Sequence, residues 1–189
     1  MSAVHYKAEI AHNEKTIEKM FVAQYYTYDQ FRMYTRFIIG IAFAAVAVLA
    51  TLPMWARGLL LLAGGWLISS AEFPAQVRAD RAVEARKGVL PVMKYDFYDD
   101  RMSISGEGSM TAKYNRFEKL VEEDGYLYMF MSKSSVCMID RSTISGIEPD
   151  DLKDFIAKKT GHVWQRKKSL LSFNLYDIKE MLRQRKEGK

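Results

Sequence analysis

The side chains most often used for metal binding and nucleophilic catalysis are scarce in this chain of 189 residues. Its histidines and its only cysteine are His5, His12, His162 and Cys137. No two of them stand at the spacing that structural zinc sites use. We therefore expect no metal centre and no cofactor. Cys137 lies in the apolar run from Val136 to Ile139, which favours a small buried core residue.

Two other patterns are incomplete versions of chemical motifs. Ser105–Ser109 reads Ser-Gly-Glu-Gly-Ser, but it lacks the Gly-Lys-Ser/Thr ending of a phosphate-binding loop, so it predicts a hairpin turn. The acidic clusters Asp99-Asp100 and Glu122–Asp124 are typical of solvated turns, and no partner group for acid–base catalysis is evident. A nucleophile elbow of the form Gly-x-Ser-x-Gly does not occur in the sequence. We expect a non-catalytic chain.

Charge is distributed unevenly along the chain, whose formal net charge is +5. Residues 162–189 carry 8 basic and 3 acidic groups, whereas residues 91–161 carry 10 basic and 13 acidic groups. A nucleic-acid-binding domain usually concentrates positive charge on its folded surface, so we expect no nucleic-acid partner. Basic segments that flank an apolar block fit a position near anionic lipid instead.

The apolar block runs from Phe37 to Ala71 and contains a single charge, Arg57. A lone helix of that length would exceed the thickness of a bilayer core, and Pro53 breaks it in two. We predict helices at about 35–52 and 55–73, which form a transmembrane hairpin with the lipid bilayer as partner. The alternative is a buried hairpin in a soluble protein, but so short a chain could hardly cover it.

Basic residues near the ends of the two spans predict the orientation. Six flank the outer ends of the hairpin, and only Arg57 lies in the turn, which by the positive-inside tendency puts both termini in the cytoplasm. Tyr34 and Trp55 have the amphipathic rings that the membrane boundary favours. The residues expected at the interface are Arg32, Tyr34, Arg36, Trp55, Arg57, Arg78, Arg81, Arg86 and Lys87.

Small residues line one face of each predicted span. They are Gly40, Ala44, Ala47 and Val48 in the first and Gly64, Gly65 and Ser69 in the second. Small side chains let helix backbones approach closely in lipid. The pattern fits either packing within the hairpin or self-association of two chains.

The segment 1–34 precedes the hairpin. Residues 4–10 alternate partly and predict a short strand, and Asn13 is a candidate N-cap for a helix that begins at Glu14. Apolar residues recur there at helical spacing from Ile17 to Phe31. This amphipathic helix could lie in the membrane interface or pack on the cytoplasmic domain, and the sequence supports both readings equally.

Beyond a basic juxtamembrane connector, residues 74–90, the pattern changes to strands over residues 91–161. Apolar and polar residues alternate in short runs separated by turns at Asp99-Asp100, Gly106–Gly108 and Asp124-Gly125. A helix follows from Pro149 to its stop at Gly161. The fold class expected is α+β: a transmembrane hairpin plus a small antiparallel β-sheet or partial barrel capped by one helix.

This chain resembles the YcxB-like bacterial membrane proteins over roughly residues 35–160. The resemblance rests on a two-span hairpin followed by the strand pair YDFYDDRMSIS, then Tyr114 before NRFEKLVEEDGYLYMF, then the strand VCMID. It implies a pleckstrin-homology-like module on the cytoplasmic side of the bacterial inner membrane. The family has no established enzymatic activity that could be carried over and no functional residues to transfer. The family often has Pro-Lys after the last strand, where this chain has Asp140-Arg141.

The tail, residues 162–189, is basic, and Leu171, Leu175, Ile178 and Leu182 predict an amphipathic helix. Its cations could simply favour the helix dipole. Alternatively they dock the tail on anionic lipid or on a partner. The residues expected to do so are Arg166, Lys167, Lys168, Arg183, Arg185 and Lys186.

Together these patterns favour a membrane-anchored module that binds or regulates a protein partner or a second copy of itself. The first alternative is a sensor that binds a lipid or small ligand at the cytoplasmic leaflet, which would need a pocket with convergent polar groups. The second alternative is an accessory subunit of a membrane enzyme or transporter.

Overall fold

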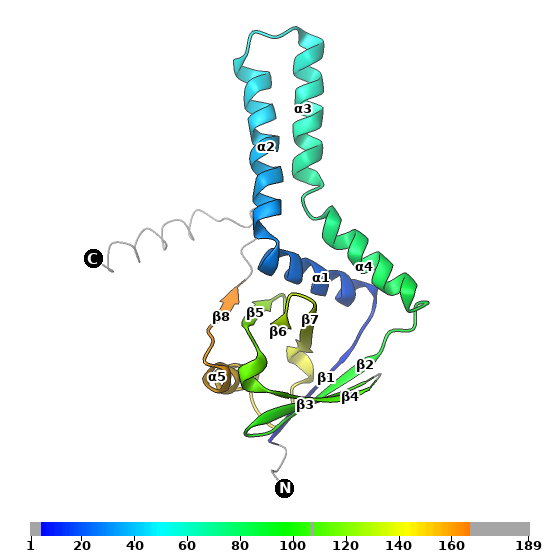
Figure 1. Cartoon of the computed structure of the whole chain (residues 1–189), viewed down its shortest axis with the longest axis vertical. Helices are drawn as coiled ribbons and strands as arrows, with labels where there is room; N and C mark the ends of the chain where they lie inside the picture. The colour runs from blue at the N-terminus through cyan, green and yellow to red at the C-terminus, as the bar shows by residue number, and fades with distance from the viewer. Residues whose placement is uncertain (1–4, 107, 167–189) are drawn as a thin grey trace, which may run out of the picture.

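The computed structural model describes residues 5–106 and 108–166, and within them the chain is an α+β protein (Figure 1). The helices are α1 (Glu14–Tyr28), α2 (Gln30–Leu49), α3 (Met54–Ser69), α4 (Phe73–Ala85) and α5 (Pro149–Thr160). The strands are β1 (Tyr6–Ala11), β2 (Val92–Phe97), β3 (Arg101–Ser105), β4 (Ser109–Lys113), β5 (Lys119–Glu123), β6 (Tyr126–Ser132), β7 (Ser135–Asp140) and β8 (Trp164–Arg166). Two short 3-10 turns, η1 (Tyr114–Arg116) and η2 (Arg141–Thr143), interrupt the strands.

The strands form two sheets of four, in the orders β1-β2-β3-β4 and β7-β6-β5-β8. All neighbours are antiparallel except β5 and β8, which are parallel. The antiparallel strands and the helix after them were expected. The prediction of one small sheet built from residues 91–161 was wrong. The N-terminal strand β1 completes the first sheet and β8 the second. Period-2 alternation identifies a strand but carries no information about which distant strand it pairs with.

Local turn and cap signals hold where the sequence placed them. Asp124 and Gly125 connect β5 to β6 with φ values of +47° and +82°, and Gly allows this geometry without steric cost. Asn13 caps α1 by accepting from the backbone N–H of Thr16, and Pro149 begins α5. Gly161 ends α5 in the left-handed region.

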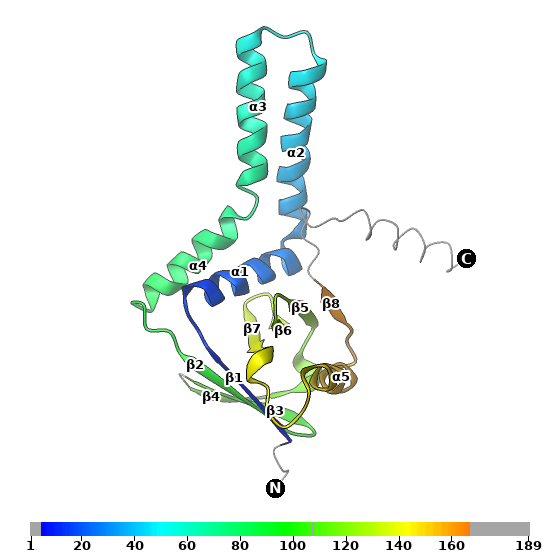
Figure 2. The ribbon, with the colours of Figure 1, turned by 180° about the vertical axis from the view of Figure 1, so that it is seen from behind.

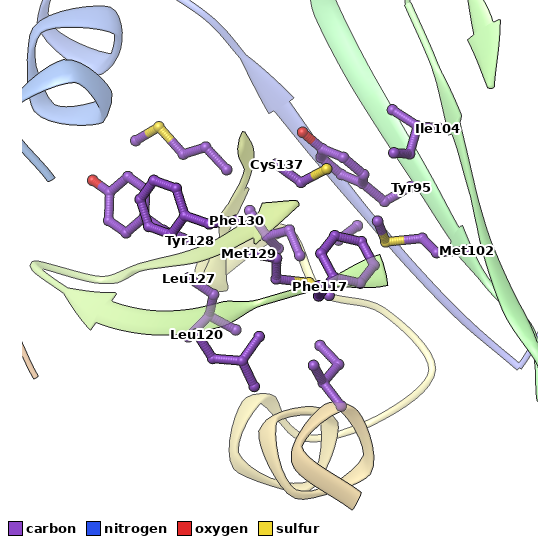
Figure 3. Close-up of a cluster of buried hydrophobic side chains, with 14 of the residues drawn as sticks. Tyr95, Met102, Ile104, Phe117, Leu120, Leu127, Tyr128, Met129, Phe130 and Cys137 are labelled. Atoms are coloured by element: carbon purple, nitrogen blue, oxygen red, sulfur yellow. The ribbon is translucent and has the colours of Figure 1, made fainter. Parts of the chain in front are cut away.

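The core of the β module lies between the two sheets and is filled by large side chains (Figure 3). Tyr95, Met102 and Phe117 are among those that meet there, and Leu152 and Ile156 of α5 close one end. Cys137 is buried among them, as predicted, and burial raises the pKa of its thiol to about 12. The thiol is therefore neutral at physiological pH and acts as a core side chain.

The Asp140-Arg141 corner has a structural role. The Asp140 carboxylate accepts from the backbone N–H and the hydroxyl of Ser142 at 2.9 and 2.7 Å and so begins η2. Arg141 pairs with Glu122 of β5 at 2.5 Å and with Asp150 of α5 at 2.9 Å. These contacts join the second sheet to α5.

Helices α2 and α3 form a hairpin that projects away from the β module (Figures 1 and 2). They meet at Gly40 and Gly64, where a Cβ on Gly64 would lie 2.7 Å from the carbonyl oxygen of Gly40. Ala47 of α2 is also buried, whereas Gly65, Ser69 and Val48 are exposed. The small residues of the inner face therefore serve packing within the hairpin.

The outward faces of the hairpin are apolar and exposed. The largest exposed side chains include Val48 (69%), Leu62 (73%) and Trp66 (69%). Among the described helices, α2 alone is long and apolar enough to cross a membrane, and α3 and α4 reach that length only as a pair bent by 49°. The second span predicted at 55–73 ends earlier, at Ser69, because the chain turns there into α4.

Helices α1 and α4 lie between the hairpin and the sheets (Figure 1). Of the two readings of the amphipathic helix, packing on the β module is the one the structure shows, since Ala23 is fully buried in the module's core. Most of residues 74–90, predicted to be a basic juxtamembrane connector, lie in α4. Its buried Ala75 and Ala79 recur at helical spacing and face α1.

The contact at Gly64 gives a matched pair of substitutions for testing the hairpin. We predict that Gly64→Ala lowers the stability of the solubilised full-length chain by about 1–3 kcal/mol, because the new methyl group would overlap the backbone of α2. Gly65→Ala is the control, since a Cβ there meets nothing within 4 Å. Unfolding curves followed by tryptophan fluorescence measure both. Equal effects of the two substitutions would contradict the close approach of the helices.

Candidate functional site

The junction between the helices and the β module is centred on Asp29. Helix α1 ends at Tyr28 and α2 begins at Gln30, so Asp29 is the single residue between them. Its backbone carbonyl accepts from the N–H of Arg32 at 3.0 Å, but its carboxylate makes no cap to α2. The side chain is therefore free to bind groups from other elements.

The carboxylate of Asp29 joins two cations that are distant in sequence. One oxygen accepts from Nζ of Lys133, in the turn between β6 and β7, at 2.6 Å, and the other accepts from Arg78 of α4 at 3.2 Å. The side chain is only 10% exposed. Burial alone would raise the pKa of this carboxyl group, but hydrogen bonds and positive charge from Lys133 and Arg78 outweigh it and lower the pKa. Asp29 is thus held in its charged form.

Further polar contacts fasten the C-terminal half of α1 to the second sheet. Lys119 of β5 donates to the carbonyl oxygen of Thr27 at 3.1 Å, and its Nζ lies 4.3 Å from the ring centre of Tyr28. The Tyr28 hydroxyl donates to Glu118, and burial together with that carboxylate raises the tyrosine pKa to about 12. The side-chain amide of Gln24 donates to the carbonyl of Lys133. The helix is therefore fixed in register over the strands.

A cavity of about 420 Å³ lies beside α1, between the two sheets. Helix α1 contributes Ile17 and Met20 to its wall, and Tyr95 and Ile104 come from the first sheet. Ser109, Ser134, Ser135, His12 and Arg86 supply polar groups to its lining. An apolar wall with a few polar groups is the usual make-up of a small-molecule site.

The ionisable side chains of His12 and Arg86 line this cavity. Burial, and then the charge of Arg86, lower the pKa of His12, so that its ring is neutral at physiological pH. Its Nδ1 lies 3.4 Å from the Thr16 hydroxyl. His5 contacts the exposed Asp99 at 3.1 Å elsewhere on the module. Within residues 5–106 and 108–166, no group of three or more His, Cys, Asp or Glu residues could hold a metal ion.

The predicted interface residues fall into three places. Arg32, Tyr34 and Arg36 lie in the first turns of α2, at the base of the hairpin, and Trp55 and Arg57 lie at its tip. Arg57 is exposed and donates to the carbonyl of Ala50 at 3.1 Å, which satisfies the end of α2. Arg78, Arg81, Arg86 and Lys87 lie on or just beyond α4. The predicted interface residues of α2 and α3 therefore lie at opposite ends of the hairpin.

Arg166 ends β8 and lines a second cavity together with Gln30 and Tyr34 of α2. The chain therefore leaves the described part beside the base of the hairpin. Lys167, Lys168, Arg183, Arg185 and Lys186 of the predicted tail helix lie outside the described residues.

Sequence reasoning placed Arg78 at the membrane interface and missed Asp29 altogether. The pair depends on the antiparallel packing of α1 on α4, which no local pattern predicts. One signal was available: an aspartate that interrupts a long helical pattern marks a helix boundary, and there its carboxylate can bind groups from elsewhere.

Asp29→Asn tests the junction. We predict that it lowers stability at neutral pH by about 2 kcal/mol, because Lys133 and Arg78 would then hydrogen-bond to a neutral amide in place of a charged carboxylate. A carboxyl group with a lowered pKa contributes stability above its ordinary pKa of 3.8 and loses that contribution as pH falls below it. Denaturant titrations at several pH values should therefore show that the free energies of unfolding of the wild type and Asp29→Asn converge in acid. Asp80→Asn, on the exposed surface of α4, is the control and should change little.

Comparison with known proteins gives one family match. Residues 97–156 match the model of the family described as YcxB-like protein. The matched segment runs from the end of β2 into α5 and includes Asp140-Arg141; the helical hairpin and α1 lie outside it. Comparison with curated proteins and with solved structures finds no match. Residues 97–156 are thus similar to the YcxB-like family, which is the family that the sequence resembles.

Proposed function

We propose that this protein is a non-catalytic, membrane-anchored module of the bacterial inner membrane that binds or regulates a protein partner. The observation that carries the proposal is a β module fastened through α1 to the base of an exposed apolar hairpin. On a protein in water, the exposed apolar surface of this hairpin would mark an interaction site. The length of the hairpin fits a bilayer.

The dimensions of the hairpin support two spans. Helix α2 has 20 residues and extends about 30 Å; Arg32 and Arg36 lie in its first turns, and its uncharged part, residues 37–49, extends about 20 Å. The 16 residues of α3 extend about 24 Å, and a short span is accommodated when flanking side chains reach the interface. Trp55 and Arg57 stand at the tip, where they can do so.

The charges support cytoplasmic termini. Basic residues gather at the base of the hairpin and along α4, and Arg57 is the one charge at the tip. The positive-inside tendency places the base, and with it the β module, in the cytoplasm. Arg166 beside the base is where the basic tail begins, which supports docking of that tail on anionic lipid.

The module has the parts that a pleckstrin-homology-like fold needs. Two sheets of mostly antiparallel strands face one another over a filled core, and α5 closes one end. Besides the cavity beside α1, the module offers exposed surfaces for binding. Its role is therefore scaffolding or regulation at the membrane.

A second candidate function is sensing of a lipid or small ligand, and the cavity beside α1 favours it. A ligand there would contact α1 and both sheets, so its binding would bear on the helix that holds the module to the hairpin. The third candidate is an accessory subunit of a membrane enzyme or transporter, in which the outward faces of α2 and α3 contact the larger subunit.

Single cysteines introduced into a Cys137→Ala chain test the topology. We predict that Met54→Cys, at the tip and 90% exposed, reacts with a membrane-impermeant maleimide added to intact spheroplasts. Val163→Cys, on the module and 83% exposed, should react only after lysis. Protection of Met54→Cys together with labelling of Val163→Cys would reverse the orientation, and labelling of both would exclude a span.

A photo-crosslinking amino acid at exposed positions of the module tests the interaction. We predict that Val163, or Met110 on the edge strand β4, forms a discrete adduct with a protein in native membranes, whereas Trp66 on the hairpin reacts mostly with lipid. Mass spectrometry identifies each adduct. A purified chain that carries one small amphiphile and yields no protein adduct would contradict the interaction role and support the sensor.

A further inference from the structure

A smaller cavity, of about 350 Å³, lies at the base of the hairpin between α1, α2 and α4. Tyr25 comes from α1, Pro74 from α4, and the others from the first turns of α2. The described residues that line it are Tyr25, Phe31, Arg32, Thr35, Arg36 and Pro74. They include two arginines and no carboxylate, so the cavity is suited to an anion.

The hydroxyl group of Tyr25, whose side chain is part of the cavity wall, is unusual. Tyr25 is 1% exposed, and its oxygen has no hydrogen-bond partner among the described residues. Nearly all buried polar side-chain atoms in proteins are paired, because an unpaired one loses its bonds to water. A hydroxyl in this state can donate to an acceptor that enters the cavity.

The two arginines lie one helical turn apart on α2 and therefore on one side of it. Arg36 donates one N–H to the carbonyl of Ser70 at 3.1 Å, which leaves the rest of its guanidinium available, and Arg32 is exposed. Like charges at this spacing repel each other in a helix. An anion held between them would remove the repulsion and accept from both planar forks.

The position of the cavity identifies the anion's source. Exposed apolar side chains of α2 begin immediately above it, at Ile38 and Ile39, and Phe31 at its level is 82% exposed. If α2 and α3 span the bilayer, this level is that of the lipid headgroups on the cytoplasmic side. We propose that Tyr25, Arg32 and Arg36 bind the phosphate of an anionic phospholipid. This inference rests on the membrane-spanning hairpin of the proposed function.

The full-length chain in lipid nanodiscs tests the site. The probe lipid is phosphatidylglycerol mixed into phosphatidylcholine, and retention of the probe is measured by native mass spectrometry alongside the melting temperature. We expect phosphatidylglycerol to bind the wild type and raise its melting temperature. Arg32→Gln and Tyr25→Phe should each weaken retention about tenfold or more, the factor expected for a hydrogen bond to a charged group.

Tyr25→Phe also has a signature that misfolding would not produce. In phosphatidylcholine alone it should melt at or above the wild-type temperature, because it removes a buried hydroxyl group that lacks a partner. Arg81→Gln, on the exposed surface of α4, is the control and should retain phosphatidylglycerol as the wild type does. Equal losses in Arg81→Gln and Arg32→Gln would show a diffuse charge effect and overturn the site.

Two further arms separate the sources and the premises. Inorganic phosphate added to phosphatidylcholine discs should leave the melting temperature unchanged, and stabilisation equal to that by phosphatidylglycerol would overturn the lipid assignment. Flotation of each variant with phosphatidylcholine vesicles reports insertion separately. A chain that inserts but shows no preference for phosphatidylglycerol overturns the site alone, whereas a chain that fails to insert overturns the proposed function.

Discussion

Helix α1 is buried on two sides, and the arrangement of the whole molecule depends on that constraint. Ala23 belongs to the core of the β module, whereas Val22, Tyr25 and Tyr26 pack with α4 and the start of α2. Because two apolar faces of α1 are buried, one against the module and one against α4 and α2, the hairpin and the module share this helix. The Asp29 carboxylate then fixes the end of that helix, since it binds Arg78 on one side and Lys133 on the other.

This construction explains why the same short segment adjoins both candidate binding places. The cavity beside α1 opens between the sheets and includes Ile17, and the cavity at the base of the hairpin includes Tyr25, two turns along the same helix. A ligand in either place contacts the helix that positions the module. A partner bound to the module and a lipid bound at the hairpin would then be linked through α1.

What the sequence could predict was local. The cap at Asn13, the hairpin turn at Asp124-Gly125 and the stop at Gly161 follow from the residues themselves, and the structure has each of them. The spacing of small residues left packing within the hairpin and self-association open, and in the structure Gly40 faces Gly64. The pairing of β1 with β2, the helix α4 and the ion pairs of Asp29 depend on contacts between distant segments. Packing decides those contacts; the sequence alone marks Asp29 only as a helix boundary, without its partners.

In the structure the β module is held in a fixed position relative to the hairpin. Its most direct measurement is the distance between spin labels at Met54→Cys, on the tip, and Val163→Cys, on the module, in a Cys137→Ala chain in lipid nanodiscs. Pulsed electron–electron double resonance should give one narrow distance distribution, because α1 packs on the module on one side and on α4 and α2 on the other. A broad distribution, as for a module on a flexible tether, would contradict a fixed position of the module.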